Sequence, residues 1–140
     1  MMKLLLPVLF AALILSPACG GSPTDPSVNA NVPYSQTDLT VGTGKVAAVG
    51  NAVTVNYSLW LYDRAGTDNK GKFLQSGSFP FVIGGGRSIQ GFDQATTGMA
   101  VGGKRRAIIP PNLGYGSAGM PPDIPGNATL VFELELVSVT

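Results

Sequence analysis

The sequence predicts an α+β domain in which an antiparallel β-sheet wraps around one short α-helix. Two long segments, 52–62 and 128–139, alternate apolar and polar residues, which is typical of strands with one buried face. Several shorter strand-like segments are bounded by glycine and proline. One segment, 89–97, has apolar residues at helical spacing. Many short strands with one short helix favour this arrangement.

The first 36 residues are expected to lie outside the folded domain. Residues 1–19 resemble a signal peptide, because Lys3 precedes an apolar core at 4–15 that is too short for a membrane-spanning helix of about 20 residues. Small residues then precede Cys19, as in bacterial lipoproteins, whose cysteine becomes the acylated N-terminus. The alternative is an ordinary secretory signal with an incidental cysteine. Residues 20–36, rich in Gly, Ser, Pro and Asn, are predicted to be a flexible linker.

The folded domain is predicted to span residues 37–140, and its clearest strand is 52–62. Five apolar side chains alternate along this strand and share one face: Val53, Val55, Tyr57, Leu59 and Leu61. Trp60 falls on the other face, which the pattern does not explain. A polar loop is predicted at 63–71. Shorter strands are predicted at 39–43, 45–49, 72–76, 79–83 and 104–109.

Three glycines, 84–86, precede the predicted helix at 89–97. Ser88 is suited to cap this helix, and apolar residues from Ile89 to Met99 suit one buried face. The last strand, 128–139, places Leu130, Phe132, Leu134 and Leu136 on one face and Glu133 and Glu135 on the other. This strand and 52–62 therefore supply most of the predicted core.

Composition excludes several classes of function. The formal net charge is +1, so no basic face indicates a nucleic-acid partner. The chain has no histidine, which excludes Ser-His-Asp and Cys-His catalytic sites and nearly all zinc sites. Its single cysteine cannot form an internal disulfide. We therefore expect neither a metal ion nor a cofactor.

The most informative segment is 101–119, with the sequence VGGKRRAIIPPNLGYGSAG. Its paired glycines predict a turn, and 104–109 then predicts a short strand. Pro110 and Pro111 end that strand, because proline cannot donate to a sheet ladder. Two glycines flank Tyr115, so the backbone can bend sharply around the ring. On this spacing alone, a surface loop with a packing tyrosine is the simpler interpretation.

The whole segment, however, resembles the signature of the FKBP-type peptidyl-prolyl cis-trans isomerases, in the form carried by bacterial members. The resemblance extends from about Thr40 to Thr140, because further matching blocks follow in the family's order at 55–57, 71–73, 79–81, 88–93 and 128–133. It implies the FKBP fold, a twisted antiparallel half-barrel sheet wrapped around one short α-helix. It also implies a monomer that binds proline-containing polypeptides and macrolide ligands. Together with the signal, it implies a lipoprotein of the bacterial envelope.

The resemblance also implies an aromatic pocket. Its catalytic residues would be Tyr57, Phe73, Ile89, Phe92, Tyr115 and Phe132, and its further substrate-binding residues Phe79, Ser88 and Ile124. Phe92 would form the floor on which a proline ring packs. The Ile89 N–H and the Tyr115 hydroxyl would donate hydrogen bonds to substrate carbonyls. Taken singly, the phenylalanines are better explained by core packing, and only their joint match to the family favours a site.

A chain without histidine can catalyse this isomerisation. Rotation about a peptide bond is slow because resonance creates a barrier of roughly 18–20 kcal/mol. The twisted amide is less polar than the planar one, so an apolar pocket favours it without proton transfer. We therefore expect a prolyl isomerase acting on secreted or envelope proteins. The alternative is a non-catalytic proline-binding or chaperone module that uses the same pocket.

The chain departs from the family's pattern at several positions. Leu74, followed by Gln75, stands where the family commonly has an aspartate that is thought to interact with the strained amide. Ser88 replaces an apolar residue, and Asp123 enters a loop that is often wholly apolar. We therefore expect weak to moderate activity, which the substitution Leu74→Asp is expected to raise.

Overall fold

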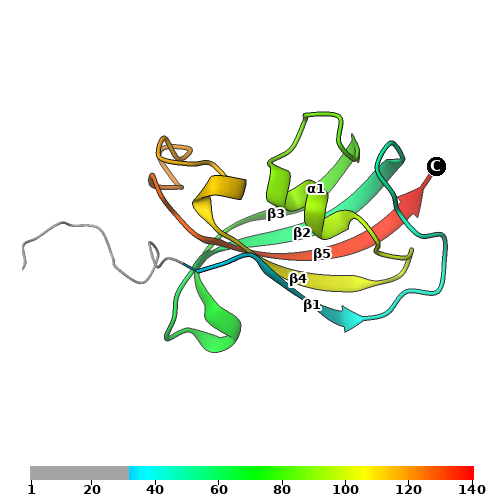
Figure 1. The fold of residues 1–140 in the computed structure, drawn as a ribbon. Helices are drawn as coiled ribbons and strands as arrows, with labels where there is room; N and C mark the ends of the chain where they lie inside the picture. The colour runs from blue at the N-terminus through cyan, green and yellow to red at the C-terminus, as the bar shows by residue number, and fades with distance from the viewer. Residues whose placement is uncertain (1–31) are drawn as a thin grey trace, which may run out of the picture.

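The computed structural model describes residues 32–140, so the predicted signal peptide, Cys19 and most of the predicted linker lie outside the described residues. Five strands form one antiparallel sheet in the order β1-β4-β5-β2-β3, and helix α1 lies against one of its faces (Figure 1). The predicted α+β class and the FKBP-like arrangement are confirmed. We call the face that packs against α1 the inner face, and the opposite one the outer face.

The elements follow one another along the chain without a second domain among the described residues. They are β1 (Ser35–Thr40), β2 (Ala52–Tyr62), β3 (Lys70–Val82), α1 (Gln90–Thr96), β4 (Lys104–Ile109) and β5 (Leu130–Val139), with single 3₁₀ turns at Thr67–Asn69 and Pro111–Leu113. The chain ends with β5 in the middle of the sheet, between β2 and β4 (Figure 1).

Three boundaries differ from those predicted. β1 begins at Ser35, within the predicted linker, and 45–49 forms only an isolated bridge between Val46 and Ala100. The two strands predicted at 72–76 and 79–83 are one continuous strand, β3. Its Ser-Gly-Ser segment resembles a turn in sequence, but pairing with β2 continues through it. The long central strand β2 thus overrides the local turn signal.

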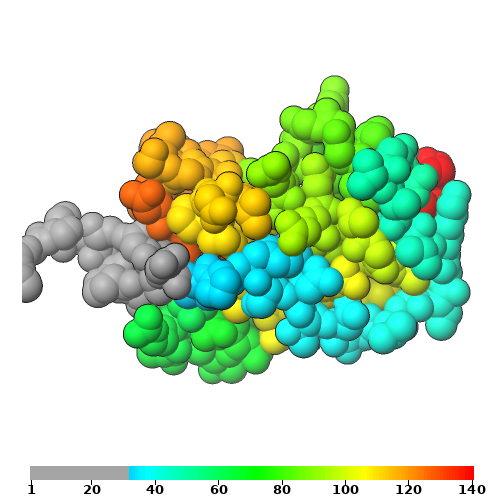
Figure 2. Space-filling model, in the orientation of Figure 1, coloured from blue at the N-terminus to red at the C-terminus, as the bar shows by residue number. Residues whose placement is uncertain are grey.

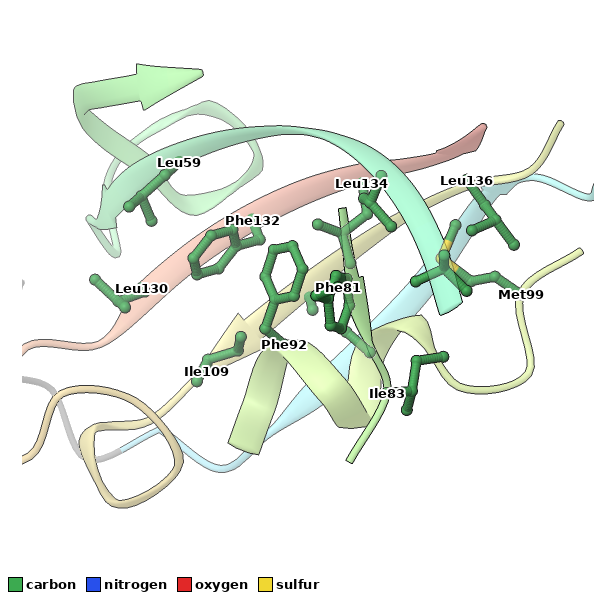
Figure 3. Packing of buried hydrophobic residues seen from close by; sticks show 14 of the residues in the cluster. Leu59, Phe81, Ile83, Phe92, Met99, Ile109, Leu130, Phe132, Leu134 and Leu136 are labelled. Carbon is green, nitrogen blue, oxygen red and sulfur yellow. The ribbon is translucent and has the colours of Figure 1, made fainter. Parts of the chain in front are cut away.

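The inner face holds the main core, which α1 closes (Figure 3). Strands β2 and β5 supply the most deeply buried side chains, including Val55, Leu59, Leu130 and Leu134, all with at most 1% of their surface exposed. Gly91 of α1 lies directly against Ile109 of β4, because an added Cβ would be 2.4 Å from Ile109 Cγ2. The absence of a side chain at position 91 therefore sets how closely the helix approaches the sheet.

A second, smaller cluster on the outer face explains Trp60. This side chain packs against the buried pair Tyr62 and Val131, together with Val32 and Ile108. Lys70 Nζ lies 4.2 Å from the centroid of the Trp60 ring, in cation–π geometry. The outer face is thus partly apolar, which the alternation of β2 alone does not indicate.

An ion-pair network crosses the outer face beside this cluster. Glu133 of β5 lies 2.7 Å from Lys70 Nζ and 3.0 Å from Arg106 Nη2, and Arg106 also lies 3.3 Å from Asp68. Burial alone would raise the pKa of Glu133, but hydrogen bonds from Lys70 and Arg106 outweigh it and hold this pKa below the ordinary value. The charged carboxylate therefore stabilises the folded state.

We expect the free energy of unfolding to decrease as the pH falls below about 4.5, the ordinary pKa of Glu133. The unfolded carboxyl takes up its proton first, so the contribution is complete above that pH and is lost as the pH falls through the folded pKa. Glu133→Gln should remove this pH-dependent contribution and lower the free energy of unfolding by about 1 kcal/mol at neutral pH. Urea unfolding between pH 3 and pH 7 measures both effects.

The matched control is Glu135→Gln, because Glu135 lies on the same face of β5 and forms no ion pair with the described residues. Equal pH dependence in the wild type and in Glu133→Gln would show that the network does not stabilise the fold.

Candidate functional site

A pocket of about 160 Å³ opens where the N-terminal end of α1 meets strands β2, β3 and β5. Its lining residues are Tyr57, Gln75, Phe79, Arg87, Ser88, Ile89, Phe92, Tyr115 and Phe132. Figure 2 shows the segment around residues 110–125 and the segment around residues 80–95 as two lobes with a notch between them. Seven of the nine lining residues are predicted site residues, so the fold brings most of the expected pocket together.

Phe92 forms the base of the pocket and is only 4% exposed. Four aromatic rings surround it edge-on, with centroids 5.3 Å away for Phe81 and Phe132, 5.9 Å for Phe79 and 6.0 Å for Tyr57. Figure 3 shows Phe81 and Phe132 beside Phe92. Edge-to-face contacts of this kind fix ring orientation in addition to burying area. The base of the pocket is therefore rigid and apolar.

The walls come from three neighbouring strands. Tyr57 of β2 and Phe132 of β5 lie with their centroids 6.1 Å apart, and Phe79 of β3 stacks on Phe81 at 5.0 Å. Tyr57 and Phe79 both lie on the inner face, because Phe79 pairs with Val55 in the register that places Val55 in the core. Strand alternation thus aims all three wall rings towards α1.

Tyr115 reaches the pocket from the loop that follows β4. The turn Pro111–Leu113 reverses the chain, and Gly116, at φ 65°, supplies the left-handed backbone that a side chain would disfavour. Burial, reinforced by the nearby Tyr57, raises the pKa of the Tyr115 hydroxyl above 10.0. The hydroxyl is therefore a protonated donor at neutral pH, and it makes no hydrogen bond with any residue of the described chain.

Ile89 supplies a second free donor. It is the N-cap residue of α1, and its carbonyl accepts hydrogen bonds from the N–H groups of Phe92 and Asp93 at 3.0 and 3.2 Å. Its own N–H donates to no acceptor within residues 32–140. The neighbouring Ser88 hydroxyl is already engaged, because it donates to Asp93 Oδ1 at 2.6 Å. Ser88 thus lines the pocket without capping the helix backbone, and α1 begins two residues after it, where the family pattern would start the helix.

Comparison with known proteins identifies the family. Residues 43–137 match the FKBP-type peptidyl-prolyl cis-trans isomerase family. The chain belongs to this family. It is 44% identical over 90 residues to peptidyl-prolyl cis-trans isomerase FKBP2 of Homo sapiens, covering 64% of this chain and 62% of that protein. It is 43% identical over 104 residues to the 39 kDa FK506-binding nuclear protein of Drosophila melanogaster, covering 73% and 28%.

Solved structures have the same fold. AtFKBP13 superposes with a TM-score of 0.66 at 30% identity, covering 76% of this chain and 93% of that chain. FkpA from Escherichia coli gives a TM-score of 0.64 at 32% identity, covering 76% of this chain and 48% of that chain.

The chain spans less than two thirds of the length of the human and Drosophila relatives. Among the described residues, no helix is long and apolar enough to cross a membrane.

Two predicted FKBP site residues lie outside the pocket. Phe73 is 51% exposed on the outer face, where its ring centroid lies 5.7 Å from that of Trp60. Ile124 is buried and lines a second cavity of about 80 Å³ with Leu59, Leu74, Gln75 and residues of the 120–123 loop, so Gln75 borders both cavities. The structure therefore does not bring these two side chains into the lining of the pocket.

A β-bulge in β3 causes the displacement of Phe73. Leu59 pairs with Gln75, but the next residue, Trp60, pairs with Phe73, so Leu74 is an extra residue in β3. A register shift of one residue moves each following side chain to the other face of the sheet. Phe73 consequently faces outward, whereas Gln75, opposite the buried Leu59, faces the pocket.

The bulge also changes the interpretation of the family's missing aspartate. Leu74 is half-buried against the core and does not line the pocket, so Leu74→Asp would place a carboxylate beside Leu59 and Ile124 and in the same cavity as the like-charged Asp123. The expectation that this substitution raises activity therefore lacks a structural basis. Gln75 is the residue of this segment that lines the pocket, and Arg87 is the other lining residue that sequence reasoning missed. The alternation of β3, read back from Phe79, could have indicated Gln75.

Proposed function

We propose that the chain is a peptidyl-prolyl cis-trans isomerase that accelerates rotation about X-Pro bonds in polypeptides. The observation that carries this proposal is the aromatic pocket, which has two unpaired donors, the Ile89 N–H and the Tyr115 hydroxyl, beside an apolar base. Both donors are suited to the carbonyls of an extended polypeptide whose proline ring enters the pocket.

The proposed mechanism depends on the difference in polarity between the two forms of the amide. A planar amide is stabilised by resonance and by water, and both are lost when a proline segment twists. Phe92 and the rings around it replace water with an apolar surface, which disfavours the planar form more than the twisted one. The Ile89 and Tyr115 donors hold the chain on either side of the rotating bond. Each tenfold gain in rate requires about 1.4 kcal/mol, so a few such contacts are sufficient.

No proton transfer is required, and the lining offers no group to perform one near neutral pH. None of the lining residues is a carboxylate, a lysine or a histidine, and the raised pKa keeps Tyr115 protonated. We therefore expect the catalysed rate to be independent of pH between about 6 and 9.

The test is a protease-coupled assay with a proline tetrapeptide. Tyr115→Phe is expected to lower kcat/KM about fivefold, which corresponds to one hydrogen bond worth about 1 kcal/mol. Tyr34→Phe is the matched control, because it also removes a tyrosine hydroxyl. In the wild type, that hydroxyl donates a hydrogen bond to Gln36, and Tyr34 does not line the pocket. If both variants turn over like the wild type, the Tyr115 hydroxyl takes no part in the reaction.

A second candidate function is a non-catalytic proline-binding or chaperone module. The replacement of the family aspartate favours it, because the pocket has no carboxylate facing the amide. Tight peptide binding without turnover would identify this function.

We also propose where the protein acts. The apolar segment 4–15 and the small residues before Cys19 support export to the bacterial envelope, with a lipid on Cys19 as membrane anchor. The folded part would then act as a monomer on secreted proteins with exposed prolines. Relatives named as FK506-binding proteins support a macrolide in the same pocket. Mass spectrometry of the native N-terminus tests the anchor directly.

A further inference from the structure

Arg87 stands at the pocket as its only charged lining residue. It is exposed and directly precedes Ser88 and Ile89, which also line the pocket. The loop that carries it needs glycine, because Gly84 and Gly86 have φ values of 82° and 83°. The loop thus places a cation beside an otherwise uncharged aromatic surface.

The Arg87 charge is not neutralised by the described chain. No carboxylate within residues 32–140 lies within ion-pair distance of it, whereas Arg105 and Arg106 both contact carboxylates. The nearby Asp93 does not line the pocket, and its carboxylate accepts the Ser88 hydroxyl at 2.6 Å. The guanidinium is therefore available to a ligand.

A proline held on Phe92 brings its neighbours close to this cation. Consecutive Cα atoms are about 3.8 Å apart across a trans bond, so the residues beside the proline must leave through the pocket mouth. A carboxylate on a residue next to the proline could therefore form a charge-assisted hydrogen bond with the Arg87 guanidinium.

We propose that Arg87 selects proline segments with an acidic residue directly before or after the proline. This inference rests on the proposed function, because it specifies the substrate class of the same pocket. An exposed ion pair changes affinity by about two- to fivefold, and the same contact should disfavour lysine at that position.

The experiment measures isomer exchange by NMR, without a coupling protease, in two series of capped peptides. One series varies the residue before proline and the other the residue after it, each with Glu, Gln or Lys. We expect kcat/KM for Glu to exceed that for Gln about threefold in at least one series, with Lys below Gln. Arg87→Glu should reverse the order, and 1 M salt should weaken it because the Debye length falls to about 3 Å.

Arg64→Gln is the matched control, because Arg64 is also exposed and forms no ion pair within the described residues but does not line the pocket. It should keep the wild-type Glu-to-Lys ratio. Equal rates for Glu and Lys in both series, or a preference that survives Arg87→Glu, would overturn the proposal. The Gln peptides separate the two hypotheses: if they are not turned over, the proposed function itself fails, whereas turnover without charge preference refutes only the selectivity.

Discussion

Replacing Arg105 by methionine is expected to lower the free energy of unfolding by about 3 kcal/mol and kcat/KM by about tenfold. Arg105 is 7% exposed on the inner face of β4, beside the C-terminal end of α1. Its Nε donates to Asp38 Oδ1 at 2.6 Å, and its Nη1 donates to the carbonyls of Ala95 and Thr97 at 2.9 and 3.1 Å. A cation at this end of a helix also complements the helix dipole.

The effect on activity follows from what α1 carries. Phe92 and the capping residue Ile89 belong to the end of α1 that faces the pocket, and Arg105 ties the other end to β4 and β1. A helix of two turns has few bonds of its own, so losing this tie should let Phe92 shift. Arg105 therefore acts as a positioning residue.

The measurement combines urea unfolding with kcat/KM at a temperature where each variant remains folded. NMR adds a local readout, because the Ile89 amide signal should shift while the Trp60 indole signal on the outer face should not. Arg106→Met on the outer face of the same strand is the control, and it should leave kcat/KM unchanged. A destabilised Arg105→Met with wild-type kcat/KM and an unshifted Ile89 signal would contradict the positioning role.

Gly91→Ala is the second substitution with a large expected effect. By helix propensity alone, alanine would stabilise α1 by up to about 1 kcal/mol. Its Cβ, however, would lie 2.4 Å from Ile109 Cγ2 and 2.9 Å from Ile109 Cδ1, closer than real contacts allow. The helix must then move away from β4, and overpacking of this kind costs about 3 kcal/mol. Turnover should fall as well, because Phe92 moves with the helix.

A double-mutant cycle with Ile109→Ala tests this explanation. The double variant should be less destabilised than the sum of the two single variants, because the second change makes room for the first. Gly77→Ala serves as the control, since its Cβ would meet Tyr57 at an ordinary 3.7 Å. A stabilised Gly91→Ala, or an additive cycle, would show that the close approach of α1 to β4 does not limit this position.

Sequence patterns were sufficient for the sheet and for most of the pocket. The alternation of β2 and β5 places their apolar residues on one face, and the matching blocks bring Tyr57, Phe92 and Tyr115 to one surface in the fold. Both signals depend on side-chain periodicity or on a long motif, which a local irregularity does not erase.

The remainder depends on details that periodicity does not encode. A single extra residue, Leu74, moves Phe73 from the inner face to the outer face, and no composition signal marks the bulge. The alternation of β2 does not explain Trp60, because its outer-face partners Val131 and Ile108 come from other strands. The sequence Lys104-Arg105-Arg106 likewise predicts a solvated basic strand. Arg105 is nevertheless buried, because its partners Asp38 of β1 and Ala95 of α1 lie on other elements.

The most direct test of the account is the rate of cis-trans exchange in a capped peptide with a single X-Pro bond and neutral flanking residues. We expect exchange to accelerate in proportion to the concentration of the protein, by the same factor from pH 6 to pH 9 and nearly equally in H₂O and D₂O. That result would support an apolar pocket that favours the twisted amide without proton transfer. Proline signals that shift on binding while exchange stays at the spontaneous rate would contradict it and identify a proline-binding module.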